Sequence, residues 1–198
     1  MIISLIKLSV KFFLKTYCQR IKIKRIVIEL KKIIFKGKVD KIIIEAEKII
    51  YKDIHLNYAK ILGHNLNIAF NRNRQLLDIK DFNAKVILHI TKEDLKNIIN
   101  NKKWNEINIK IREFSFENKN IEYISFEKDL IYFNFSKKDQ NEKIGFKVNS
   151  ENNKLILNHI SSKKDLLIEF DQNIIFKNII LFKDYLKVEL TSKVITNV

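Results

Sequence analysis

Apolar residues recur at two different spacings along this chain, and the spacing separates a first helix from a long run of strands. In residues 1–20 apolar side chains cover most of a helical surface, while Lys7, Lys11 and Lys15 recur at every fourth position on one narrow face. From residue 21 apolar and polar residues alternate, as in IKIKRIVIEL, which is typical of a half-buried strand. We therefore expect a basic amphipathic helix over 1–20, integral to or flanking a single β-rich domain over 21–198.

The longest alternating stretch, IHLNYAKILGHNLNIAF, covers residues 54–70. Its odd positions are mostly small or polar, so the side chains at even positions are expected to face the core. A strand of this length would span about 55 Å, far more than an ordinary strand. Gly63 therefore either marks a bulge that bends one long strand or lies where the segment divides into two strands.

A second helix is expected directly after the strand at 82–90. Thr91 can act as its N-cap, with Asp94 three residues later as in a capping box, and Leu95, Ile98 and Ile99 form its apolar face. The remaining chain predicts short strands separated by polar turns. These strands are expected at 107–111, 114–118, 121–126, 130–135, 143–148, 154–158, 166–170, 173–182 and 185–190.

The connections between these strands indicate the fold class. They are too short for crossover helices, so neighbouring strands are expected to pair antiparallel. The chain has 198 residues, of which 46% are hydrophobic, and this suits one domain with a substantial core. The sequence thus predicts an α+β, β-rich fold.

The positive charge is concentrated at one end of the chain. The formal net charge of +15 favours an anionic partner, either nucleic acid or an acidic membrane surface, although an AT-rich genome also enriches lysine. Residues 1–41 contain 12 Lys or Arg and two acids, whereas residues 42–198 contain 26 and 21. A genome-wide bias would spread the charge evenly, so we expect a functional basic end formed by Lys7, Lys11, Lys15, Arg20, Lys22, Lys24 and Arg25.

The opening stretch MIISLIKLSVKFFLK raises the question of what this helix contacts. Its regularly spaced lysines argue against a membrane span, and it lacks the basic start and small-residue cleavage site of a secretory signal. The helix can pack on the protein's own sheet with its lysines in water, or it can lie in a membrane interface. These two interpretations are compatible. We expect a cytoplasmic protein that associates peripherally with membranes.

The sequence contains no recognisable catalytic constellation. Its one cysteine, Cys18, excludes a disulfide within the chain, and each of the four histidines stands alone in a strand pattern. Glycine-rich phosphate loops, nucleophile elbows and zinc-protease motifs are absent. We therefore expect no metal, no cofactor and no enzymatic activity. Trp104 is expected to close one end of the core, or alternatively to anchor the chain at a membrane interface.

Two segments carry a resemblance to a known family. They are KGKVDKIIIEAEKIIYKDIHLNYAKILGHNLNI at 36–68 and LLDIKDFNAKVILHITKEDLKNIINNKKW at 76–104. The matching features are the turn at Gly37, the Tyr51-Lys52-Asp53 step into the long strand, and the phrase that begins at Thr91. With the preceding basic helix, they make the chain similar to the LmeA-like phospholipid-binding family, also called domain of unknown function 2993, and especially to its cyanobacterial members. The resemblance covers residues 5–110 and extends to the later strands only as a pattern.

The resemblance implies a fold similar to half of a tubular lipid-binding (TULIP) domain, in which a long curved antiparallel sheet wraps around a helix. It implies binding of phospholipid or another membrane lipid and supplies no catalytic residues. The over-long alternating strand agrees with it, since a curled sheet needs length and bulges. Inward side chains are then expected to line an acyl groove, although each could equally fill the core: Ile42, Ile44, Leu56, Tyr58, Leu66, Ile68, Phe70, Val86, Leu88 and Ile98.

Two other functions remain open at this stage. A nucleic-acid-binding β-protein would use the same charge, but it requires aromatic side chains between basic residues on a sheet face. The aromatic-rich stretch IEYISFEKDLIYFNF is nearly balanced in charge, which disfavours that alternative. A scaffold protein whose first helix docks on a protein partner is the third hypothesis.

Overall fold

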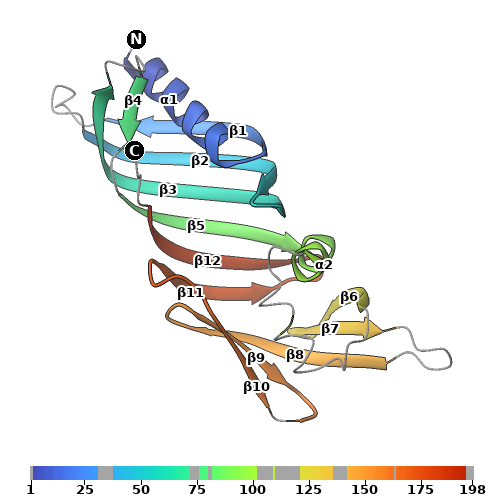
Figure 1. Ribbon diagram of the computed structural model, residues 1–198. Helices are drawn as coiled ribbons and strands as arrows, with labels where there is room; N and C mark the ends of the chain where they lie inside the picture. Colours follow the sequence, from blue (N-terminus) through green and yellow to red (C-terminus); the bar gives the residue numbers. More distant parts are fainter. Residues whose placement is uncertain are drawn as a thin grey trace.

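The computed structural model describes residues 2–30, 38–71, 76–79, 82–101, 109, 121–135, 142–162 and 164–194. Figure 1 shows an elongated molecule in which strands follow one another from the α1 end to the β10 end. The helices and strands are α1 (Ile2–Tyr17), β1 (Arg20–Glu29), β2 (Lys38–Tyr51), β3 (Ile54–Asn71), β4 (Leu76–Ile79), β5 (Phe82–Thr91), α2 (Lys92–Asn100), β6 (Ile121–Glu127), β7 (Leu130–Phe135), β8 (Glu142–Glu151), β9 (Lys154–His159), β10 (Asp165–Glu169), β11 (Ile174–Leu181) and β12 (Tyr185–Val194).

The strands form two sheets. The first sheet has the order β1-β2-β3-β5-β12-β11, with β4 added to β3, and the second has the order β10-β9-β8-β7-β6. All neighbours pair antiparallel. The predicted α+β, β-rich class is confirmed. The expectation of one long sheet is wrong, because β6 to β10 form a separate sheet of their own.

The pairing of β5 with β12 makes the second sheet an insertion into the first. After β5 the chain forms α2 and the five strands of the second sheet, and it then returns through β11 and β12. The ladder runs without a shift from Phe82 opposite Val194 to Thr91 opposite Tyr185. It therefore joins segments about a hundred residues apart, a non-local closure that costs chain entropy before the contacts form.

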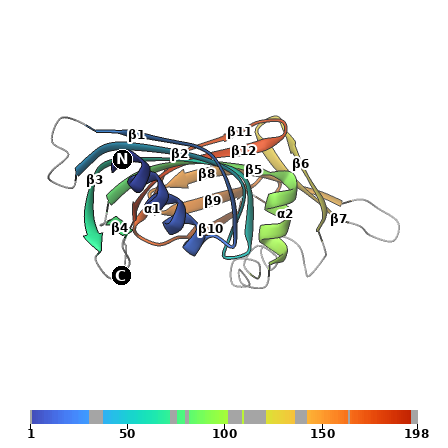
Figure 2. The same cartoon turned by 90° about the horizontal axis from the view of Figure 1, so that it is seen from above.

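Helix α1 covers the concave face of the first sheet near its β1 edge, as Figure 2 shows from above. Ile6, Val10 and Leu14 follow one another at i, i+4 spacing and are buried against the sheet. Four buried residues of β2 and β3 lie beneath the helix. We call them the α1 floor: Val39, Ile42, Ile44 and Leu66.

Strands β2 and β3 are unusually long, and two left-handed residues interrupt their regular pairing. The register is constant from Lys38 opposite Asn67 to Tyr51 opposite Ile54. Lys48 in β2 and Asn65 in β3 have positive φ angles of 51° and 54°, a conformation that side chains rarely adopt in a strand. Residues 54–70 thus lie within one strand, and its irregular residue is Asn65 and not Gly63.

These two interruptions change which side chains face the core. Between them the inward positions of β3 are odd, and Ala59, Ile61 and Gly63 contact the core. Beyond them Leu56 and Leu66 point inward at even positions. The prediction that even positions face the core along the whole segment is wrong for its middle, since each left-handed residue shifts the alternation by one.

Gly63 is required by close packing. A Cβ at this position would lie 2.9 Å from Ile42 Cγ2, 3.1 Å from a ring carbon of Phe82 and 3.2 Å from Leu66 Cδ1. Small residues recur around it on the concave face, as at Ala59 and Ala84. This fits a strongly curved sheet, because side chains on its inner face converge and leave less room.

Helix α2 begins with the predicted capping box. The Asp94 N–H donates to Thr91 Oγ1 at 3.1 Å, and the Thr91 N–H donates to Asp94 Oδ2 at 3.0 Å. The same carboxylate accepts from the Asn57 N–H at 3.2 Å. Asn57 lies opposite the left-handed Lys48, so the break in the β2–β3 ladder frees a backbone donor that docks α2 on the sheet.

The largest core cluster joins both sheets and α2. It contains Phe126, Phe133, Phe135 and Phe146 from the second sheet, together with Ile99 of α2 and Phe176 of β11. Strand β11 lies beside β8 at this junction, and the Phe176 N–H donates to the Asn152 carbonyl at 2.7 Å. The second sheet is thereby packed against the edge of the first.

The strands expected at 107–111 and 114–118 lie outside the described residues, apart from Ile109. Gly37 and Trp104 also lie outside them.

Replacing Gly63 with alanine tests the close packing of the concave face. We expect Gly63→Ala to lower the free energy of unfolding by about 1–3 kcal/mol, because the added methyl group overlaps Ile42 and crowds Phe82 and Leu66, so these side chains must move. Urea denaturation measures the change. Asn65→Gly is the matched control and should leave stability nearly unchanged, since glycine tolerates the positive φ. Equal stability of Gly63→Ala and the native chain would contradict this account.

Candidate functional site

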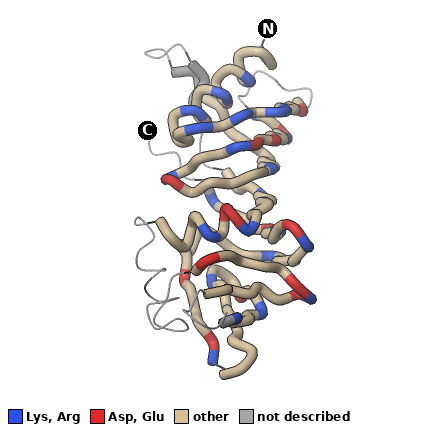
Figure 3. Tube along the Cα trace, turned by 90° about the vertical axis from the view of Figure 1, so that its right-hand side faces the viewer, with Lys and Arg blue, Asp and Glu red and all other residues tan. Residues whose placement is uncertain are grey.

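The outer surface of α1 combines lysines with exposed apolar side chains. Lys7, Lys11 and Lys15 are exposed, and Leu8 and Phe12 beside them are 56% and 55% exposed. The opposite side of the helix holds the residues buried against the α1 floor. Figure 3 shows Lys and Arg along α1 and β1 at the end of the molecule that carries the N-terminus.

Lys22 and Lys24 of β1 lie on a different face from the lysines of α1. Ile21 and Ile23 pack against the cluster beneath α1, so Lys22 and Lys24 point to the convex face of the sheet. Lys24 Nζ lies 3.2 Å from Glu47 Oε2. The seven predicted basic residues are all exposed, but the structure brings only the three lysines of α1 together on one helical face.

Several lysines on the convex face are neutralised by glutamates on the same or a neighbouring strand. Lys60 Nζ lies 3.0 Å from Glu45 Oε1, and Glu189 contacts Lys85 at 2.8 Å and Lys187 at 2.7 Å. Hydrogen bonds from Lys187 and Lys85 lower the pKa of Glu189 to about 2. In the described part of the chain, by contrast, no carboxylate forms an ion pair with Lys7, Lys11 or Lys15. The positive charge of α1 is thus locally unbalanced.

A row of aromatic rings crosses the convex face, and the sequence analysis missed it. Tyr58 lies 4.7 Å from His89, His89 lies 4.4 Å from Tyr185, and Tyr185 lies 4.8 Å from Phe182, measured between ring centroids. Burial, followed by Lys187, lowers the pKa of His89, which favours its neutral form. The rings come from β3, β5, β12 and the turn before β12, so only the cross-strand register could have predicted the row.

The residues expected to line an acyl groove separate into distinct groups. Ile42, Ile44 and Leu66 are buried beneath α1, and Ile68 packs against that cluster. Leu56, Val86, Leu88 and Ile98 are half-buried. Tyr58 is a wrong prediction, because it stands on the convex face beside His89. The side chain of Phe70 lies outside the described residues.

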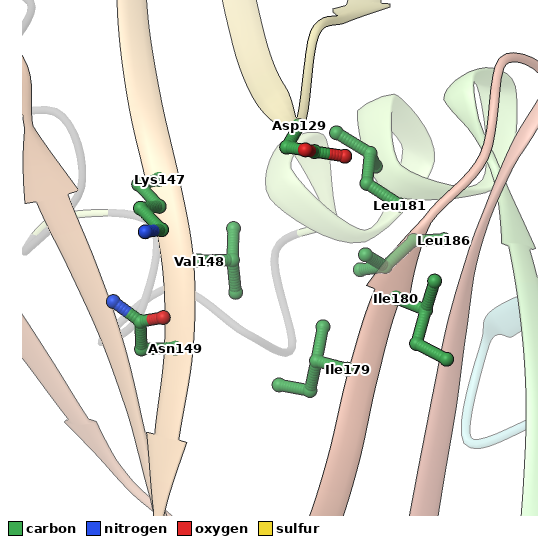
Figure 4. A pocket seen from close by; sticks show the side chains of 8 residues that line it. All are labelled: Asp129, Lys147, Val148, Asn149, Ile179, Ile180, Leu181 and Leu186. Carbon is green, nitrogen blue, oxygen red and sulfur yellow. The ribbon is translucent and has the colours of Figure 1, made fainter.

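A pocket of about 230 Å³ opens between the two sheets, where β8 diverges from β11 (Figure 4). Val148 points from β8 into the gap towards Ile179 of β11, while Lys147 and Asn149 lie on the other side of β8. A second pocket of about 490 Å³ adjoins the start of α2, and its lining includes Arg20, Lys48, Glu93 and Asp94. Its two cations are balanced by two acids, so neither pocket presents a net charge suited to an anion.

The described residues offer little catalytic chemistry. Among them, no three His, Cys, Asp or Glu side chains gather as a metal site would require. Burial raises the pKa of the Cys18 thiol, and this lowers its thiolate fraction. Neither helix of the described chain has the length and apolar character needed to cross a membrane.

Comparison with known proteins adds no relative. No protein-family model, no curated protein and no solved structure matches this chain. The resemblance to the LmeA-like family therefore stays a prediction from the residues quoted above.

The convex ion pairs should make stability depend on acid. Because the folded pKa of Glu189 is about 2, against an ordinary 4.5, its contribution is complete above pH 4.5 and is lost as the pH falls towards 2. We expect Glu189→Gln to lower the free energy of unfolding at neutral pH by about 1–2 kcal/mol and to flatten its decline below pH 4.5. Denaturation across pH measures both effects.

Glu122→Gln is the control for the lost charge, since Glu122 is exposed. It should reproduce neither effect. An unchanged acid limb in Glu189→Gln would show that the two lysines do not hold this carboxylate in its charged form.

Proposed function

We propose that this chain is a non-enzymatic lipid-binding protein that associates peripherally with anionic membrane surfaces through the outer face of α1. The observation that carries the proposal is the pairing of unbalanced lysines with exposed apolar side chains on one short helix. On the convex face of the first sheet, glutamates contact Lys24, Lys60, Lys85 and Lys187. Lys7, Lys11 and Lys15 instead lie beside the exposed Leu8 and Phe12 without a carboxylate partner in the described chain.

The physical basis is the combination of two weak forces. A lysine near an anionic bilayer contributes about 1 kcal/mol through the surface potential, so three of them give measurable attraction. Leu8 and Phe12 can then insert at the boundary between headgroups and acyl chains, where their exposed area leaves water. Neither force alone holds a protein on a membrane for long.

The concave face of the first sheet supports the lipid-binding part of the proposal. Its side chains are apolar along several strands, from the α1 floor to the half-buried Val86 and Leu88. An apolar inner face on a curved sheet beside a helix is the arrangement expected of half a TULIP-like domain, and an acyl chain is the ligand that such a surface would take.

The nucleic-acid alternative has less support. It would use the aromatic row on the convex face, but those rings stack mainly on one another and the nearby lysines contact glutamates. Bases need open ring faces and phosphates need unpaired cations. The scaffold alternative would use the same α1 surface, so vesicle binding discriminates between it and the proposal.

Neutralising α1 tests the electrostatic contribution. We expect the triple variant Lys7→Gln, Lys11→Gln and Lys15→Gln to lose most binding to vesicles of equal parts phosphatidylcholine and phosphatidylglycerol at low salt, measured by co-sedimentation. The native chain should bind these vesicles, release them at high salt and ignore pure phosphatidylcholine.

The matched control replaces three exposed lysines far from α1: Lys164→Gln, Lys177→Gln and Lys183→Gln. It removes the same charge and should retain most of the binding. Equal loss in both triple variants would mean that net charge, and not the α1 surface, attracts the membrane. A native chain that ignores both kinds of vesicle would refute the proposal.

Removing the apolar pair tests insertion separately. We expect Leu8→Ser with Phe12→Ser to weaken binding about tenfold or more while the salt dependence of the remaining binding persists, because the lysines are intact. Leu167→Ser with Ile175→Ser is the control, since these exposed side chains lie on β10 and β11. Unaltered affinity of the α1 variant would show that the contact is electrostatic only.

A further inference from the structure

Helix α1 is apolar on two opposite sides. Its inner side buries Ile6, Val10 and Leu14, while its outer side leaves Leu8 and Phe12 more than half exposed. A helix that packs on a sheet in water normally has one apolar stripe and a polar remainder. The second apolar side of α1 therefore indicates a second apolar environment beyond the sheet.

The inner side of α1 occupies the place where a lipid chain would lie. Three of the residues expected to line an acyl groove, Ile42, Ile44 and Leu66, are covered by the helix. The buried residues of this contact are aliphatic on both sides, with Phe13 and Phe82 at its margin. The buried Ser9 hydroxyl donates to the Leu5 carbonyl of the same helix at 3.1 Å. Aliphatic contacts lack directional bonds, so lipid chains can replace them.

The link between α1 and β1 can act as a hinge. Only Cys18 and Gln19 separate the two elements. The Gln19 side chain is held by the turn between β2 and β3, where its Oε1 accepts from the Asp53 N–H at 3.0 Å and its Nε2 donates to the Asp53 carboxylate. These two hydrogen bonds hold the C-terminal end of α1 near the β2–β3 turn. The described hydrogen bonds include no similar side-chain contact at the N-terminal end of α1.

From these observations we infer that α1 is a lid over the α1 floor, and that contact with an anionic membrane displaces it. The inference rests on the proposed function and adds its regulation. In water the docked state is favoured, because displacement would expose the inner side of α1 and the floor together. At a bilayer α1 can lie in the interface, and an acyl chain can cover the α1 floor. The equilibrium between the docked and displaced helix therefore shifts towards the displaced state.

Distances between spin labels test the lid. Labels are placed at Ser4→Cys near the N-terminal end of α1 and at Lys177→Cys on β11, in a chain whose cysteine is removed by Cys18→Ala; Ser4 and Lys177 are exposed. With vesicles of equal parts phosphatidylcholine and phosphatidylglycerol, we expect a new distance population displaced by about 10 Å or more, the diameter of a helix. A pair at Lys22→Cys and Lys177→Cys, both on the first sheet, is the control and should not change.

Co-sedimentation of the same labelled samples separates the outcomes. A displaced population in the vesicle-bound chain, with the control pair unchanged, supports the lid. Bound chain with an unaltered Ser4 distance overturns the lid and leaves the proposed function standing. Absence of binding overturns both. A change in the control pair overturns the lid as well, because it would mean that the sheet itself deforms.

Discussion

The ladder between β5 and β12 is the constraint on which the rest of the structure depends. It closes the first sheet across an insertion that contains α2 and the whole second sheet. Without this ladder, β5 would be an open edge of a sheet that contains only β1 to β5. Strand β11 would then not be held beside β8. Because the two strands are far apart in sequence, the native concave face exists only once this distant pairing has formed. Every surface discussed above lies on or beside that sheet.

The two faces of the first sheet differ in chemistry. On the convex face, lysines and glutamates of neighbouring strands neutralise one another, as at Lys85 of β5 and Glu189 of β12. Such cross-strand pairs support the register and keep the face soluble. On the concave face the side chains are apolar and partly small, and α1 covers the end nearest β1. The lysines of α1 differ from these convex lysines, because no carboxylate of the described residues forms an ion pair with them.

The position of α1 determines whether the α1 floor is buried core or an exposed apolar surface. Residues such as Ile42 and Leu66 suit an ordinary core and the lining of a ligand groove equally well. A core and an acyl groove both require aliphatic side chains shielded from water. In the structure they are core as long as α1 is docked. Whether they also bind lipid depends on the free energy of docking α1, which is set by apolar contacts on its inner side and by the environment available to its outer side.

The local features of this protein follow from its sequence alone. Short-range spacing predicts the basic N-terminal helix, the capping box of Thr91 and Asp94, and the antiparallel strands. The concentration of charge is read directly from the residues. The direction of side chains in the middle of β3 depends on the folded structure, because Lys48 and Asn65 adopt left-handed conformations that no two-residue period reveals. Likewise, the division into two sheets, the aromatic row from Tyr58 to Phe182 and the separation of β1 cations from α1 lysines depend on pairings between distant strands. Those pairings are chosen by the packing of the whole chain, and local spacing carries no information about them.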